Sequence, residues 1–171
     1  MNIRAHWVRF ALGLSLLSAT GWLSACASTN ANNAQAQARV HTELAARYYQ
    51  AGQVAVAVQE AQIALDSDAG YVPGHTLLAL IYAQLRQNAQ ADAHFRQALS
   101  LSEAQRLPTS DLRNSYAWYL CQTDRMAQGL NELSPVLRDP LYGSLDKALV
   151  NASVCAARLE QYELADSYVN A

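Results

Sequence analysis

Cysteine and histidine are the residues of this chain best suited to nucleophilic, redox or metal chemistry, and they are few. The chain has three cysteines and four histidines. His41, His75 and His94 are isolated in sequence, and no His-x-x-x-His or Cys-x-x-Cys pattern occurs, although metal sites commonly use such spacings. A Cys–His nucleophile pair stays open as an alternative, but no motif known for one is present. We therefore expect no catalytic residues, no metal and no cofactor, and hence a protein that is not an enzyme.

Composition narrows the class of partner. Twelve basic residues face fourteen acidic ones, and only 15% of the chain is charged. Such a chain has no basic field to neutralise phosphates, so nucleic acid is not expected as a partner. No glycine-rich phosphate-binding motif occurs either. Seven glycines and four prolines are too few for the many tight turns of an all-β fold.

The first 26 residues resemble an export signal. Arg4 and Arg9 precede an apolar run over residues 10–22, and small residues follow, which is the order of a secretory signal peptide. The run is shorter than the roughly 20 residues that span a bilayer, so a membrane-spanning helix is the less favoured alternative.

The four residues that follow the apolar run, Leu-Ser-Ala-Cys at positions 23–26, resemble the lipobox of bacterial lipoproteins. The resemblance implies removal of residues 1–25 as a signal peptide and lipidation of Cys26. Because Ala27 follows, rather than the aspartate typical of inner-membrane retention, we expect an outer-membrane protein, lipid-anchored and facing the periplasm. Residues 27–37 contain only Ala, Ser, Thr, Asn and Gln, so residues 26–37 are expected to be a lipidated N-terminus and a flexible tether.

An internal repeat predicts the fold. Apolar or small residues at Leu44, Ala45, Tyr48, Ala57, Ala61, Ala64 and Leu65 recur 34 positions later as Leu78, Ala79, Tyr82, Ala91, Phe95, Ala98 and Leu99. This period resembles the tetratricopeptide repeat (TPR), a helix-turn-helix unit. We expect an all-α TPR superhelix with repeats at 38–71, 72–105, 110–143 and 146–171, the last incomplete. Residues 106–109 are additional to the period.

Small residues mark where paired helices approach closely. In the first helices these are Ala45, Ala79, Ala117 and Ser153, and in the second helices they are Ala57, Ala91, Gly129 and Ala165. The first turn contains Gly52, whereas Arg86, Asp124 and Glu160 occupy the same place in the others. We therefore expect those three turns to use a different chemistry. Val169 falls at a core position with no helix after it, which favours a truncated chain.

The first helices of a TPR array line a concave groove. Positions expected to face it are Arg39, Thr42, Tyr49, Thr76, Leu80, Asn114, Trp118, Gln122 and Arg158. Trp118 is the main candidate because tryptophan is enriched at interface hot spots. A partly buried core position explains it equally well.

The other two cysteines, Cys121 and Cys155, fall on the first helices of repeats three and four, which stack side by side. Because the periplasm is oxidising, we favour a disulfide between them. The alternative is two small buried hydrophobic residues.

Three segments resemble the PilF/PilW family of type IV pilus biogenesis and stability lipoproteins. They are Asn-Ser-Tyr-Ala-Trp-Tyr-Leu-Cys over residues 114–121 followed by Gln122, Asp-Pro-Leu-Tyr over residues 139–142, and residues 151–155. Ser153 departs from the glycine often found at that position. Members of the family commonly have more repeats than this chain, which again favours truncation.

The resemblance implies a pilotin or assembly factor. Such a protein helps a pilus secretin, PilQ-like, reach the outer membrane or form stable multimers there, or binds other pilus-assembly proteins. Its mechanism is binding without chemistry. The alternative function is a TPR lipoprotein adaptor for β-barrel assembly or for cell-wall hydrolases.

Overall fold

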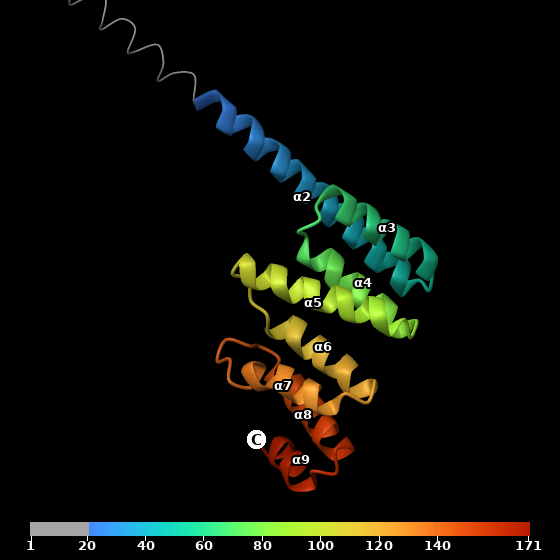
Figure 1. Cartoon of the computed structure of the whole chain (residues 1–171), viewed down its shortest axis with the longest axis vertical. Coiled ribbons are helices and arrows are strands. Elements are labelled where there is room, and N and C mark those ends of the chain that lie inside the picture. Colours follow the sequence, from blue (N-terminus) through green and yellow to red (C-terminus); the bar gives the residue numbers. More distant parts are fainter. Residues whose placement is uncertain (1–20) are drawn as a thin grey trace, which may run out of the picture.

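The computed structural model describes the backbone of residues 21–171 and the side chains of residues 30–171. This part of the chain forms eight helices and no strand. The helices are α2 (Gly21–Gln50), α3 (Val54–Ser67), α4 (Val72–Gln84), α5 (Asn88–Ala104), α6 (Ser110–Gln122), α7 (Met126–Val136), α8 (Leu145–Arg158) and α9 (Tyr162–Val169). They form four antiparallel pairs, stacked as an elongated solenoid with α2 at one end and α9 at the other (Figure 1). The predicted signal peptide lies largely outside the described residues.

Helix α2 differs from the expected flexible tether. It spans 30 residues and includes 27–37 as regular helix, and its N-terminal half projects beyond the paired part (Figure 1). Alanine and glutamine are strong helix formers, and no glycine or proline interrupts residues 27–37. The packed half, where Ala38 and Ala45 are fully buried, supplies the nucleus from which the helix extends. No helix between residues 21 and 171 has both the length and the apolar character needed to cross a membrane.

Small residues hold the paired helices close together, as predicted. Ala45, Ala79 and Ala117 have no exposed surface on the first helices, and Ala57 and Ala91 have none on the second. The prediction for repeat four is off by one position, because Ala152 is fully buried while Ser153 is half-buried. The spacing from Ala117 to Ala152 is therefore 35 residues, against 34 residues from Ala45 to Ala79. On α9, Val169 at the expected core position is 70% exposed.

All five helix-ending turns with a left-handed residue share one geometry, so the expectation of a different turn chemistry is wrong. Gly52 has φ 76°, and Arg86, Arg106, Asp124 and Glu160 have φ between 56° and 60°. After α4, for example, the Gln87 amide donates to Tyr82 and the Arg86 amide to Ala83. These are the two bonds of a Schellman motif. The turn at Asp124 has one of them, from the Arg125 amide to the Leu120 carbonyl. Glycine adopts this conformation readily, but other residues strain the backbone.

The stacking changes where residues 106–109 intervene. First helices pack on each other at the α2–α4 and α6–α8 contacts, whereas α4 and α6 lack a comparable contact. Aromatic side chains fill the wider space beneath them: the ring of Phe95 on α5 lies 4.8 Å from that of Tyr116 and 5.5 Å from that of Tyr119. The core is thus continuous below α4 and α6, while the surface between them is left open.

The shared turn geometry predicts opposite effects of exchanging glycine. A Cβ added at Gly52 meets no atom within 4 Å, so Gly52→Ala strains only the backbone and lowers the free energy of unfolding by about 1 kcal/mol. Glu160→Gly relieves the same strain and raises it, by less than that amount because glycine also gives the unfolded chain more freedom. Urea unfolding of both variants checks this. A Gly52→Ala protein as stable as the wild type contradicts it.

Candidate functional site

Two adjoining hollows lie between α4 and α6. One, of about 750 Å³, is lined by Tyr49, Leu80, Ala83, Gln84, Arg86, Asn88, Trp118, Tyr119, Gln122, Thr123 and Asp124. The other, of about 380 Å³, is mostly apolar and is lined by Val72, Pro73, Thr76, Leu77, Leu80, Ser102, Leu107, Pro108, Asp111, Leu112 and Ser115. Leu80 lines both, so together they form one groove along the two helices, called here the α4–α6 groove.

The groove gathers five of the nine residues expected to face a partner. Tyr49, Leu80, Trp118 and Gln122 line the larger hollow, and Thr76 lines the apolar one. Trp118 is 48% exposed, so it is a surface residue and not part of the core. A large aromatic side chain held half-exposed beside an apolar hollow is typical of a binding hot spot.

The other four residues lie elsewhere. Asn114 accepts a hydrogen bond of 2.9 Å from Asn151 on α8. Arg158 donates to the backbone carbonyl of Cys121 at 2.6 Å. Arg39 is exposed near Glu43. Thr42 is buried, and its hydroxyl has no hydrogen-bond partner within the described structure, so it cannot face a groove.

Behind the groove, a polar network connects the second helix pair to the third. Asp92 on α5 pairs with Arg125, after α6, at 2.6 Å and accepts a hydrogen bond from the Tyr116 hydroxyl. Burial, together with the Asp92 carboxylate, raises the pKa of Tyr116 to about 12. The guanidinium of Arg125 also lies 5.1 Å from the centre of the Tyr119 ring. These contacts tie the second and third pairs together, although α4 and α6 are apart.

Two histidines meet inside the second pair. The Nε2 of His75 donates to the carbonyl of Ala69 at 3.1 Å, because a carbonyl can only accept. Its Nδ1 therefore accepts from the Nδ1–H of His94, 3.0 Å away. Burial, and secondly the nearby His75, lower the pKa of His94. The structure places no three metal-ligating side chains together among the residues it describes.

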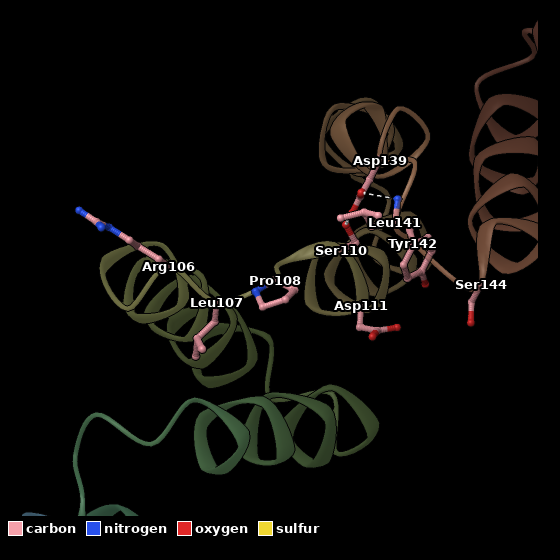
Figure 2. Close-up of a pocket in the computed structure, with 10 residues that line it drawn as sticks. Arg106, Leu107, Pro108, Ser110, Asp111, Asp139, Leu141, Tyr142 and Ser144 are labelled. Atoms are coloured by element: carbon pink, nitrogen blue, oxygen red, sulfur yellow. Dashed lines mark hydrogen bonds between the residues drawn. The ribbon is translucent and has the colours of Figure 1, made fainter.

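A third hollow, of about 590 Å³, lies at the edge of the third pair (Figure 2). Asp139 accepts hydrogen bonds there from the Ser110 hydroxyl at 2.5 Å and from the Leu141 amide at 2.9 Å, which lower the pKa of its carboxyl group. Figure 2 shows Arg106 directed away from the hollow. Because both contacts of Asp139 are internal, this residue stabilises the turn at 139–142 and offers no free chemistry.

The structure joins Cys121 on α6 and Cys155 on α8 by a disulfide, with Cα atoms 5.4 Å apart. Gly129 on α7 packs directly against the sulfur of Cys121. A Cβ at this position would also lie 2.9 Å from the carbonyl oxygen of Ala117, so only glycine fits there. The side chain of Cys26, the expected lipidation site, lies outside the described residues.

Half of the groove was not predicted from the sequence. The unpredicted residues are Leu77, Leu107 and Leu112, which form the apolar wall, and Gln84 with its amide. The sequence carried one signal, because residues 106–109 interrupt the repeat at the place where α4 and α6 lack a close contact.

The fold and groove define a class: a tetratricopeptide-like solenoid whose exposed features suit protein binding. No protein-family model matches the chain. An uncharacterized protein of Haemophilus influenzae is 27% identical to it over 143 residues, which cover 82% of this chain and 78% of that protein.

Among solved structures the chain is similar to PilW, described as a widely conserved type IV pilus biogenesis factor. The TM-score is 0.72 and the identity 30%, over 78% of this chain and 59% of PilW. It is also similar in fold to Pseudomonas aeruginosa PilF, with a TM-score of 0.73 and 20% identity, over 80% of this chain and 60% of PilF. The chain thus spans about 60% of the length of these solved proteins. The resemblance predicted from the sequence is confirmed.

The disulfide predicts a measurable stabilisation. It closes a loop of 34 residues, for which the chain-entropy model gives roughly 3–4 kcal/mol. We expect reduction, or the Cys121→Ser/Cys155→Ser double substitution, to lower the free energy of unfolding by up to this amount. Peptide-resolved mass spectrometry of untreated, alkylated protein checks the bond itself. Alkylation at both Cys121 and Cys155 would show that it does not form.

The lowered pKa of His94 predicts that acid destabilises the fold. The unfolded chain binds a proton at His94 near pH 6.5, whereas the folded chain does so only at lower pH. Stability from this residue is therefore complete above about pH 6.5 and declines as the pH falls toward the lowered value. Urea midpoints at about pH 7 and pH 5.5 should differ less in His94→Gln, which keeps a donor but does not titrate. An equal loss in both proteins contradicts this.

Proposed function

We propose that this chain is a pilus-assembly factor anchored in the outer membrane, which binds a protein partner in the α4–α6 groove. The observation that carries this proposal is the similarity to PilW over 78% of the chain. The groove supports it from the chain's own residues, because an apolar hollow beside a half-exposed Trp118 is suited to hold a polypeptide.

The partner we propose is the pilus secretin, PilQ-like, whose localisation or multimer assembly the chain promotes. Lipid at Cys26 would fix the protein to the periplasmic face of the outer membrane, since several acyl chains anchor far more firmly than one. Helix α2 runs from before Cys26 into the first pair, so the solenoid would be held by a helical stem. No bond is made or broken: the groove stabilises one arrangement of the partner.

Deletion of the gene tests this function. We expect heat-resistant secretin multimers to disappear from outer-membrane fractions on gels while secretin monomer remains. Full-length protein should restore them, and Trp118→Ala should restore them poorly. Tyr162→Ala provides a matched control, because Tyr162 is an exposed aromatic residue on α9, away from the groove. Unchanged multimers and normal piliation in the deletion strain would reject the proposal and favour the β-barrel or cell-wall adaptor.

The anchor has its own test. Cys26→Ala removes the thiol that would be lipidated, so we expect the protein to leave the outer-membrane fraction and surface pili to decrease. Fractionation and pilus counts measure both effects. Normal piliation by a mislocalised protein would show that the anchor is dispensable.

A further inference from the structure

The two walls of the α4–α6 groove carry matching amides. Gln84 on α4 accepts a hydrogen bond at its Oε1 from the hydroxyl of Tyr49 on α2. Gln122 on α6 accepts one at its Oε1 from Arg158 on α8, at 3.2 Å. In each case a residue of the neighbouring first helix occupies the oxygen. Each amide is therefore oriented with its Nε2–H donors left over, and both amides line the larger hollow.

Oriented amide donors distinguish between kinds of polypeptide. A helix satisfies nearly all of its backbone groups internally, so its sides present no free carbonyl to Gln84 or Gln122. An extended segment presents a free carbonyl at every residue. The donors of these two amides therefore complement an extended backbone better than a helical one.

Charge in the groove argues for an uncharged segment. The apolar hollow has a single ionisable side chain, Asp111. An acidic residue seated beside Leu77, Leu80 and Leu112 would lose its water without gaining a cationic partner there. A basic residue would gain only the exposed carboxylate of Asp111, and an exposed ion pair contributes little to offset the lost water. In the larger hollow the charges of Arg86 and Asp124 are opposite in sign. Neither hollow therefore attracts a segment of strong net charge.

We propose that the α4–α6 groove binds an extended, uncharged peptide segment, with an apolar side chain in the hollow at Leu80 and backbone carbonyls accepting from Gln84 and Gln122. The 13-residue α4 is roughly 20 Å long, so about six extended residues match it. The segment's remaining face packs against Trp118. This specifies the partner at the site of the proposed function and rests on that function only for its biological role.

Trp118 supplies the measurement. The chain has three tryptophans, and Trp7 and Trp22 lie within the proposed signal peptide of residues 1–25. Protein processed at Cys26 therefore reports through Trp118 alone, and in unprocessed protein the Trp7→Phe/Trp22→Phe substitutions remove the other two signals. The probes are blocked hexapeptides that alternate valine, leucine or phenylalanine with threonine or glutamine. A second set carries lysine or glutamate at the apolar positions, and a third is a blocked, helix-forming peptide of about 14 residues.

We expect saturable changes in Trp118 fluorescence with the uncharged hexapeptides, and binding at least about tenfold weaker for the charged and helical probes. Gln84→Leu and Gln122→Leu should each weaken hexapeptide binding about tenfold, because each removes donors to a carbonyl while keeping the helix. Gln97→Leu, at an exposed position of α5, is the control and should bind normally. Circular dichroism confirms that the variants are folded.

Three results would overturn the inference: no saturable binding of any uncharged hexapeptide, equal or tighter binding of the helical probe, or no effect of either glutamine substitution in folded protein. The proposed function fails separately. Groove variants that lose hexapeptide binding but keep normal pili would leave this inference standing and reject the pilus role. Loss of pili in Trp118→Ala with preference for the helical probe would do the reverse.

Discussion

Close approach of helices at alanine and glycine is the constraint on which this structure depends. Ala45, Ala79 and Ala117 have no exposed surface, and Gly129 has no room for a Cβ beside the Cys121 sulfur. A larger side chain at such points forces helices apart. Because the two helices of each pair meet at such small residues, the position and direction of the first helix in the pair are fixed. The side chains on the outer face of that helix are consequently well placed to meet a partner.

The groove lies where this packing between successive first helices is absent. Residues 106–109 intervene between α5 and α6, and there α6 does not pack closely on α4. Phe95, Tyr116 and Tyr119 fill the space below, and the Asp92–Arg125 pair closes it behind. The surface above stays open and apolar. On either side of the groove, polar contacts join neighbouring first helices: Tyr49 on α2 with Gln84 on α4, and Arg158 on α8 with Gln122 on α6. These contacts orient the two amides toward the groove.

The helical fold could be predicted from the sequence because the 34-residue period records which residues face the core. The resemblance to PilW and PilF came from the segments 114–122, 139–142 and 151–155. The turns could not be predicted, since a left-handed backbone at Arg86 or Glu160 contradicts residue preference and is imposed by the packing of the helices on either side. The helical state of residues 27–37 was not predicted, because a run of small and polar residues with no large apolar side chain to pack is typical of a flexible tether. Within the groove, the repeat frame predicted Trp118 and Leu80. The positions of Leu107 and Leu112 could not be predicted, because they depend on where α6 lies after residues 106–109.

The opening between α4 and α6 also bears on the shape of the whole solenoid. The curvature of a repeat protein is the sum of small rotations between successive units, and two of the three joints here are fixed by contact between first helices. The joint between α4 and α6 lacks that surface contact and is held from below, by the packing of Phe95 on Tyr116 and Tyr119 and by the Asp92–Arg125 pair. A molecule bound in the groove would press on the one joint that is held from a single side. Any rotation it caused there would be carried along α8 to the far end of the solenoid.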